Sequence, residues 1–199
     1  MIKTDTNTQI SLYQMNGLNK INYSIDCFDE LKLELVNGWK DIDSKFIFQT
    51  PKYSNIISFN LYEDFDSKFP NTITVIKEIQ KIGGMYLRLF IYPPYTRTTF
   101  HKDAPQFRYV LPINANEKYF NYEIIDDNIN RLQLDKEFFE IDTEDKLLNF
   151  NNKFLENGNK IYNWKPNKSY LIGTNTHAHL NFSNQTRIVI VFDHKGKLF

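Results

Sequence analysis

Apolar positions recur at two different spacings, which separate helical from strand-like segments of the chain. In "NTITVIKEIQKIGG", residues 71–84, four isoleucines repeat at helical spacing: Ile73, Ile76, Ile79 and Ile82. Asn71 or Thr72 can cap this helix at its start, and Gly83 and Gly84 can end it. The pattern predicts a short helix that packs its isoleucine stripe on a core.

A preceding segment, "DELKLELVNGWKD", residues 29–41, supports two interpretations. Leu31, Leu33 and Leu35 alternate with other residues, as they do along a strand with one buried face. Asp29 can also cap a helix at the same place. The pattern alone does not decide between a strand and a helix.

From residue 85 onward, the chain changes to short runs of β-branched and aromatic residues separated by polar turns. These runs are "MYLRLFIYPP", "RYVLPI", "KYFNYEII", "SYLIG" and "RIVIVFD". Several short strands with turns between them are typical of a β-sandwich or a jelly-roll barrel. We therefore expect a mainly β fold with flanking helices (α+β) in one domain: a mixed α/β support over residues 1–84 and a jelly-roll core over residues 85–199.

A helical insertion interrupts the core at about residues 128–160. In "DTEDKLLNFNNKFLENGN", residues 142–159, one helical face carries Leu147, Phe150, Phe154 and Leu155. Asp142 or Thr143 can cap this helix, and Gly158 can end it. We favour a helix packed against the barrel, and a lid over a pocket is the alternative, since long segments between paired strands often serve a site.

The composition narrows the class of protein. Apolar residues make up 41% of the 199-residue chain and aromatic residues 16%, which is enough to build a core. The 24 basic and 24 acidic residues cancel, which argues against a nucleic-acid partner, because such proteins carry a basic surplus. Cys27 is the only cysteine, so no intrachain disulfide forms, and a reducing, cytoplasmic location fits best. No apolar run reaches the length of a membrane span, so we expect no membrane partner.

The stretch "TTFHKDAPQFRYVLPI", residues 98–113, contains the first candidate site residues. On a strand, positions i and i+2 project from the same face, so His101 and Asp103 can converge on one metal ion. A distant histidine, brought alongside by the barrel, would supply a third ligand. Two imidazoles and one carboxylate leave open positions and suit non-haem Fe(II). The tripeptide alone is a weak signal, because polar residues before a strand can simply cap a turn.

The segment "GTNTHAHLNFSNQTRIVIVFD", residues 173–193, strengthens this signal. It holds two candidates for the third ligand, His177 and His179. Arg187 follows His177 by ten residues and opens an apolar strand, where an isolated charge is unfavourable. Its planar guanidinium suits a carboxylate. That carboxylate belongs either to a protein Asp or Glu, or to the far end of a small diacid.

The order of these residues resembles the 2-oxoglutarate/Fe(II) oxygenases with a double-stranded β-helix (jelly-roll, cupin-like) core. More narrowly, the order H-x-D, distant His and Arg ten residues later is similar to that of the aspartyl/asparaginyl β-hydroxylase family. The resemblance covers roughly residues 85–123 and 164–193. The N-terminal support and the helical insertion remain unassigned by it.

The resemblance implies roles for individual residues. His101, Asp103 and His177 would bind Fe(II) and would be the catalytic residues. Arg187 would hold the 5-carboxylate of 2-oxoglutarate. Arg108 would lie near a carboxylate of the cosubstrate or of the substrate.

His179 is the alternative third ligand. His177 is preferred because its distances along the chain to Arg187 and to Asn181, which matches a structural Asn of the motif, fit the family pattern. His179 would then face the substrate, support the ligands or lie in the core. His194, expected beyond the last strand, would be exposed and without a role.

Three departures from the family pattern leave the substrate open. Val110 stands where the family often has His, and the usual "PPG" turn reads "PPY", with Tyr95. Asp103 is retained, although many members of the narrower family lack this ligand. Its presence favours hydroxylation over halogenation, because a halogenase needs a vacant ligand position for halide.

The resemblance therefore implies an Fe(II)- and 2-oxoglutarate-dependent dioxygenase. It would use O2 to hydroxylate an amino-acid side chain, free or in a peptide or protein, with succinate and CO2 as co-products. The alternative is a non-catalytic cupin-like module that binds a metal or a small molecule. A nucleic-acid demethylase fits less well, because Asp193 stands where the repair dioxygenases would carry a second Arg. Arg88, Arg97 and Arg108 can each meet a substrate carboxylate or an acidic neighbour.

Overall fold

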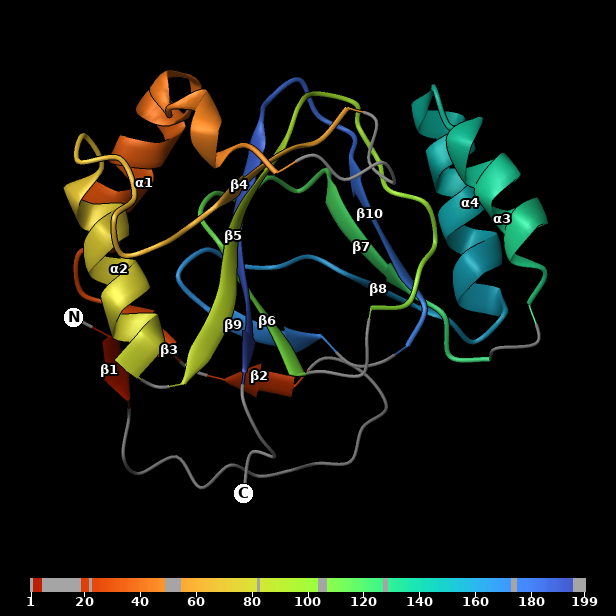
Figure 1. Ribbon diagram of the computed structural model, residues 1–199. Coiled ribbons are helices and arrows are strands. Elements are labelled where there is room, and N and C mark those ends of the chain that lie inside the picture. Colours follow the sequence, from red (N-terminus) through yellow and green to blue (C-terminus); the bar gives the residue numbers. More distant parts are fainter. Residues whose placement is uncertain are drawn as a thin grey trace.

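Two sheets lie between two pairs of helices (Figure 1). The computed structural model describes residues 2–4, 19–21, 23–48, 55–81, 83–103, 107–126, 129–172 and 175–194. One helix pair, α1 (Phe28–Gly38) and α2 (Pro70–Lys81), flanks the sheets on one side, and α3 (Arg131–Phe139) and α4 (Glu144–Glu156) flank them on the other. None of the helices in these ranges is both long enough and apolar enough to cross a membrane.

A long antiparallel ribbon, folded over on itself, forms the centre of the molecule. At the open end of the ribbon, β5 (Gly84–Tyr92) pairs with β11 (Arg187–His194), and residues 97 and 101 then form bridges with β10 (His177–Asn181). Toward the tip, β6 (Phe107–Pro112) pairs with β9 (Ser169–Ile172), and β7 (Tyr119–Glu123) pairs with β8 (Lys160–Tyr162). Successive pairs alternate between the two sheets. This is the topology of a double-stranded β-helix, so the expected jelly-roll core with flanking helices is confirmed.

The sheets take their order from this winding. The larger sheet has six strands in the order β2 (Asn19–Ile21), β9, β6, β11, β5 and β4 (Ile57–Asn60). The smaller has the order β10, β7, β8, and the bridges of residues 97 and 101 extend it beyond β10. Two further strands, β1 (Ile2–Thr4) and β3 (Tyr23–Ile25), pair with each other.

Strand β11 is buried on both faces. Ile188, Ile190 and Phe192 join the apolar cluster under α1 and α2, whereas Val189 and Val191 join a second cluster on the inner face. Burial on both faces explains why the strand reads as a continuous apolar run. Because side chains alternate along a strand, Arg187 and Asp193 point to the same inner face as Val189 and Val191.

Residues 28–38 form a helix, which decides between the two interpretations of this segment. Leu31 and Leu35 are fully buried and Leu33 is 64% exposed, because positions four apart share a helix face. The strand alternative was wrong. Asp29 does not cap the helix; Cys27 occupies the N-cap position without a side-chain hydrogen bond. Two short 3₁₀ turns, η1 (Trp39–Asp41) and η2 (Ser44–Phe46), follow.

Helix α2 confirms the isoleucine stripe for Ile73, Ile76 and Ile79, whereas Ile82 lies outside the described residues. The helix begins earlier than expected. Pro70 starts it, as proline's fixed φ allows at a first helical position. Neither Asn71 nor Thr72 is the cap; their backbone N–H groups donate to the Glu34 carboxylate of α1, at 2.9 and 2.8 Å. A carboxylate at a helix start also suits the helix dipole. At the far end Gly83 takes a φ of +86°.

The insertion contains two helices rather than the one predicted. Thr143 caps α4, as expected, by accepting from the Lys146 N–H at 3.3 Å, and Gly158 follows the helix with a φ of +76°. Leu147, Phe150 and Phe154 are buried. Leu155 is 50% exposed, so its predicted place on the buried face was wrong.

Helices α3 and α4 cover the outer face of the smaller sheet. Their buried face shares an apolar cluster with Phe100, Tyr122, Ala178 and Leu180. Residues 178 and 180 alternate with the two candidate histidines of β10, so the helices lie behind those histidines. The insertion therefore packs against the barrel, as favoured above, and does not cover the candidate ligands as a lid.

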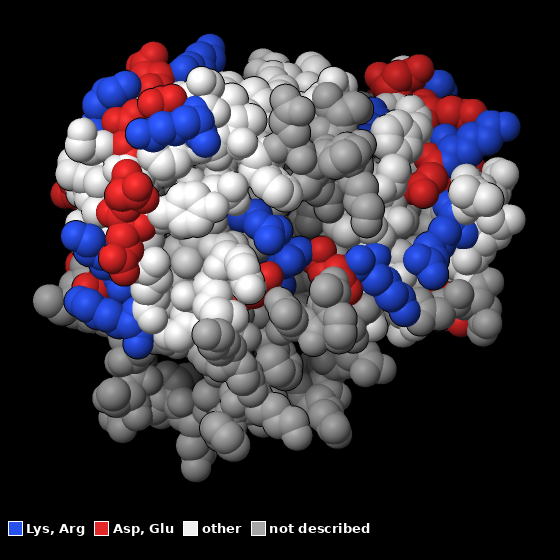
Figure 2. Space-filling model, viewed as in Figure 1, with Lys and Arg blue, Asp and Glu red and all other residues white. Residues whose placement is uncertain are grey.

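Charged side chains gather over the two helical flanks. On the face shown in Figure 2, acidic and basic groups are interspersed over α1 and α2 at one side and over α3 and α4 at the other. No large field of one sign occupies the described part of this face.

Candidate metal centre

The first two candidate ligands are brought together by the pairing of two strands. His101 and His177 are antiparallel bridge partners, and each donates its backbone N–H to the carbonyl of the other at 2.9 Å. Side chains opposite one another in an antiparallel pair lie on the same face. The two imidazole ring centres are consequently 4.5 Å apart.

Asp103 completes a group of three. Its carboxylate lies 3.4 Å from His177 Nε2, and one possible ligand atom from each of His101, Asp103 and His177 lies within 4.8 Å of the others. Such a group can hold a metal ion. We expected His101 and Asp103 to share one face of a strand. His101 is in a β-bridge, but Asp103 lies just beyond it and not in a regular strand.

Backbone carbonyls fix the orientation of both histidines. Thr99 O lies 2.8 Å from His101 Nδ1, and Asn175 O lies 3.0 Å from His177 Nδ1. With Nδ1 held by a carbonyl, Nε2 is the ring nitrogen that faces the group of three. Metal-binding histidines are commonly oriented in this way.

Asp103 is held in its ionised form. Burial alone would raise the pKa of Asp103, but its hydrogen bond to His177 and the charge of Arg108 hold it well below the ordinary value. A deprotonated carboxylate is the form that binds a metal. The side chain of Asp103 remains 16% exposed, so a ligand can approach it.

Arg108 lies between two protein carboxylates. Its Nε and Nη2 donate to the two oxygens of Asp193, at 2.7 and 3.2 Å, and its Nη1 pairs with Asp103. Burial would lower the pKa of Arg108, but the two carboxylates raise it above the ordinary value. Of the two alternatives for Arg108, the structure contains the pairing with acidic neighbours.

His179 is buried beside the group of three and is not part of it. Its Nδ1 is 3.0 Å from Asn121 Oδ1, and its ring packs near Trp164 and Tyr92, with ring centres 5.3 and 6.0 Å away. Burial keeps the pKa of His179 well below the ordinary value, so the imidazole is neutral. Its position supports the role of an interior group beside the ligands.

Arg187 is a fully buried cation without a carboxylate partner among the described residues. It is 2% exposed, donates from Nη2 to Asn121 Oδ1 at 2.5 Å, and approaches Phe120 O from Nη1 at 3.4 Å. Three aromatic rings surround its guanidinium, those of Trp164, Tyr92 and Tyr119, with centres 4.9 to 5.6 Å away. Burial lowers the pKa of Arg187 to about 10.

A pocket adjoins the group of three. It lies between the two sheets, and its polar lining includes the three candidate ligands, Arg108 and His179, whereas Arg187 lies behind the lining residue Trp164. Its apolar lining comes from the inner face of the larger sheet and from one tryptophan: Phe90, Tyr92, Val110, Trp164, Val189 and Val191. The buried indole N–H of Trp164 has no acceptor among the described residues. The site thus combines a metal-binding group with an unfilled hydrogen-bond donor.

Arg97 and Arg88, the other two arginines considered for a substrate carboxylate, contact backbone carbonyls and an aromatic ring. Arg97 donates to the carbonyls of Phe138 and Ile141 at the end of α3, and the guanidinium of Arg88 lies 5.5 Å from the ring of Phe48. Arg97 therefore holds the insertion against the barrel.

Two further expectations concern the last strands. His194 is the final residue of β11 rather than a residue beyond it, and its side chain lies outside the described part. Asn181 is fully buried, and its amide donates to the carbonyls of Tyr92, Pro93 and Gln185. Asn181 thus fastens the turn before β11 to the end of β5, in keeping with a structural Asn.

Sequence reasoning missed Asn121, Trp164 and the partnership of Asp193 with Arg108. Asn121 had a usable signal: in "YFNYE" a polar residue stands in the middle of an aromatic strand, with the same phase as Glu123. Trp164 and Asp193 had none, because their neighbours come from strands distant in the sequence.

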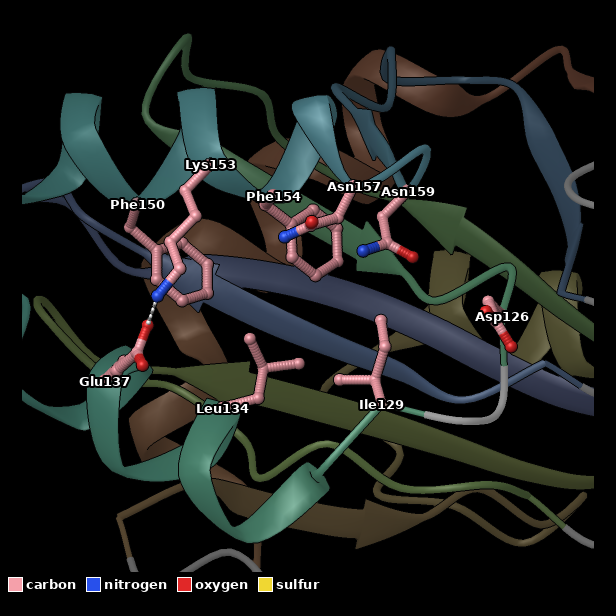
Figure 3. Close-up of a pocket in the computed structure, with 9 residues that line it drawn as sticks. All are labelled: Asp126, Ile129, Leu134, Glu137, Phe150, Lys153, Phe154, Asn157 and Asn159. Atoms are coloured by element: carbon pink, nitrogen blue, oxygen red, sulfur yellow. Dashed lines mark hydrogen bonds and ion pairs between the residues drawn. The ribbon is translucent and has the colours of Figure 1, made fainter.

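A second pocket lies between α3 and α4, away from the group of three (Figure 3). Phe150 and Phe154 of α4 project toward Leu134 and Ile129, and Lys153 pairs with Glu137 across one end at 2.7 Å. None of the candidate ligands lines this pocket.

Comparisons with known proteins add likenesses of fold. No protein-family model matches the chain, and no curated protein sequence matches it. Among solved structures, a Pseudomonas putida prolyl-4-hydroxylase is 10% identical, with 90% of this chain and 93% of that chain covered and a TM-score of 0.49. A predicted oxalate decarboxylase from Thermotoga maritima is 11% identical, with coverages of 77% and 96% and a TM-score of 0.39. The Drosophila melanogaster CENP-C cupin domain is 7% identical, with coverages of 83% and 94% and a TM-score of 0.42. At these values the likenesses carry no functional argument.

Proposed function

We propose that this protein is an Fe(II)- and 2-oxoglutarate-dependent dioxygenase that hydroxylates an amino-acid side chain, free or in a peptide or protein. The group formed by His101, Asp103 and His177 supports a divalent transition metal, because two imidazoles and one carboxylate match the ligands of non-haem Fe(II) sites. The carboxylate is ionised, and both imidazoles present Nε2.

The observation that carries the choice of cosubstrate is the buried guanidinium of Arg187. A guanidinium offers five N–H donors, and two acceptors, neither of them a carboxylate, serve Arg187 among the described residues. A charge buried in this way is unfavourable unless an anion joins it. The far carboxylate of a small diacid is such an anion, and a guanidinium binds it bidentately.

Trp164 supports the same assignment. Its ring lines the pocket and lies against Arg187, and its buried indole N–H lacks an acceptor among the described residues. A buried donor without a partner is destabilising, so an acceptor oxygen of a ligand would relieve it. The far carboxylate of 2-oxoglutarate would supply such an oxygen beside Arg187.

Residues in different parts of the site would have different roles. His101, Asp103 and His177 would hold the metal, which, when bound with 2-oxoglutarate and O2, supplies the oxidising power to hydroxylate a C–H bond, with succinate and CO2 as co-products. Arg187 would orient the cosubstrate by its far end. The apolar wall of Phe90, Val189 and neighbours would exclude water from the reacting centre.

The alternative is a cupin-like module that binds a metal or a small molecule without turnover. It shares the group of three but gives Arg187 no anion to hold. The selectivity of the pocket for the far carboxylate therefore separates the two proposals.

The test is an anaerobic titration with Fe(II) and either 2-oxoglutarate or 2-oxobutyrate, which lacks the far carboxylate. We expect a visible charge-transfer absorption with 2-oxoglutarate at much lower concentration than with 2-oxobutyrate. Arg187→Met should remove that preference, and Arg88→Met is the matched control. Metal binding with equal affinity for both keto acids would favour the binding module. Absence of metal binding would overturn the dioxygenase and leave only a module that binds a small molecule.

A further inference from the structure

Arg108 and Asp193 form a fixed unit across two strands. They are register partners of β6 and β11, and Nε and Nη2 of the guanidinium meet both oxygens of the Asp193 carboxylate. Asp193 is 3% exposed. Two parallel hydrogen bonds between buried, oppositely charged groups fix the plane of the guanidinium as well as its position.

The remaining end of the same guanidinium reaches Asp103. Nη1 of Arg108 pairs with Oδ1 of Asp103, and Oδ2 of Asp103 faces Nε2 of His177. Asp103 lies beyond the last bridge of its segment, so no strand register holds it. Its orientation therefore depends on side-chain contacts, and Arg108 supplies the ionic one.

We infer that Arg108, aligned by Asp193, is a positioning residue for the metal site. It holds one oxygen of Asp103 so that the other is presented to the metal between the two histidines. This inference rests on the metal site of the proposed function and gives Arg108 a role different from contact with a cosubstrate or substrate carboxylate. Groups that orient a ligand from behind commonly change metal affinity 10- to 100-fold when removed.

The charges explain why two carboxylates are needed. The charges of Asp103 and Arg108 alone would cancel, so this pair would bring no net negative charge to a divalent cation. Asp193 compensates the guanidinium, so the three charged groups together keep one net negative charge beside the metal. Loss of Asp193 should consequently weaken metal binding although Asp193 touches no ligand histidine in the described contacts.

A simple structural ion pair between β6 and β11 would behave differently. Its loss would lower the stability of the metal-free protein and leave the intrinsic metal affinity of the folded protein unchanged. Metal affinity is therefore the readout that separates positioning from cross-strand stabilisation.

The experiment is an anaerobic calorimetric titration of the full chain with Co(II), together with the visible spectrum of the bound ion and the melting temperature without metal. Arg108→Met should weaken Co(II) binding about 10- to 100-fold. Arg108→Lys should recover part of that loss, because it restores the charge but not the fork. Asp193→Asn should show an intermediate loss, and Arg88→Met should bind as the wild type does.

The outcomes separate this inference from the proposed function. A wild-type protein that binds neither Co(II) nor Fe(II) would overturn both. Wild-type binding with Arg108→Met and Asp193→Asn within twofold of it would overturn the positioning role alone. If Arg108→Met does not fold, Asp193→Asn, which keeps the size of the side chain, decides the matter by the same affinity measurement.

Discussion

His101 and His177 exchange both of their backbone hydrogen bonds, at 2.9 Å in each direction. Main-chain pairing therefore sets the position of one imidazole relative to the other, and the conformation of a flexible loop does not. A one-residue slip would turn one of the two side chains to the opposite face of the sheet. The register of this single bridge thus decides whether the candidate metal site exists.

His177 and His179 should differ sharply in their effect on metal binding. His177→Ala removes a member of the group of three, so we expect Co(II) affinity to fall at least 100-fold. His179→Ala removes an interior imidazole that bonds to Asn121, so metal affinity should stay within a few-fold while the melting temperature falls. The check is calorimetric titration and thermal unfolding of both variants. Equal loss of metal affinity in the two would make His179 a ligand.

Replacing Trp164 by Phe should test the unfilled indole donor. Phe keeps a six-membered aromatic ring near Arg187 and loses the indole N–H together with the five-membered ring. A hydrogen bond to a ligand is worth about 1 kcal/mol, so 2-oxoglutarate affinity should fall about 3- to 10-fold. Affinity for Co(II) alone should not change. An unaltered 2-oxoglutarate affinity would remove Trp164 from the cosubstrate site.

The contact of Asp135 with the His101 segment predicts a pH-dependent effect. Asp135 Oδ1 accepts from the Phe100 N–H at 2.7 Å, and partial burial raises the pKa of Asp135. A folded pKa above the unfolded value means that this group adds stability as the pH falls through the folded pKa. Asp135→Asn keeps an acceptor without the charge, so its stability should exceed that of the wild type at pH 7. The difference should disappear below the unfolded pKa of 3.8.

Melting temperatures of both proteins at pH 7 and at about pH 3, below the unfolded pKa, check this prediction. Asp135→Ala serves as control, because it loses the acceptor and should destabilise the protein by about 1 kcal/mol. A difference between wild type and Asp135→Asn that stays constant with pH would contradict the assigned effect of burial.

Tyr95 predicts a stabilising substitution. The "PPY" turn replaces the glycine of the family pattern, yet Tyr95 has a φ of +58°, the left-handed region that glycine and asparagine tolerate best. Tyr95→Asn should relieve about 1 kcal/mol of backbone strain, partly offset by the lost contact with the Phe182 ring. Tyr95→Ala loses the ring and keeps the strain, so it should melt lower than the asparagine variant. The reverse order in thermal unfolding would mean that the ring contact dominates.

Much of this architecture could be predicted from local patterns. The short β-branched runs became the strands of the core, and the spacing of His101 and Asp103 placed two candidate ligands near each other. Helix α3 escaped prediction because only Phe138 among its residues is buried, so it has no apolar stripe to recognise.

Relationships that depend on sheet register could not be predicted. Arg108 meets Asp193, and Asn121 meets Arg187, only because strands distant in the sequence become neighbours. Each residue alone had several acceptable partners, and the pairing was decided by tertiary packing. The same limit left the role of Arg108 open in the sequence.

The strand pairs of the folded ribbon differ in the length of chain that lies between their two strands, and this length grows from the tip to the open end. β7 and β8 enclose little more than α3 and α4, whereas β5 and β11 enclose nearly the whole core. The entropy lost on closing a loop grows with its length, so pairing at the tip shortens the loops left for the outer pairs. Formation from the tip outward would bring β6 to β9 before His101 meets His177, and would bring β5 to β11 last. Assembly of the ligand pair is in this sense a late folding event, and non-local pairing of this kind is characteristic of slowly folding β proteins.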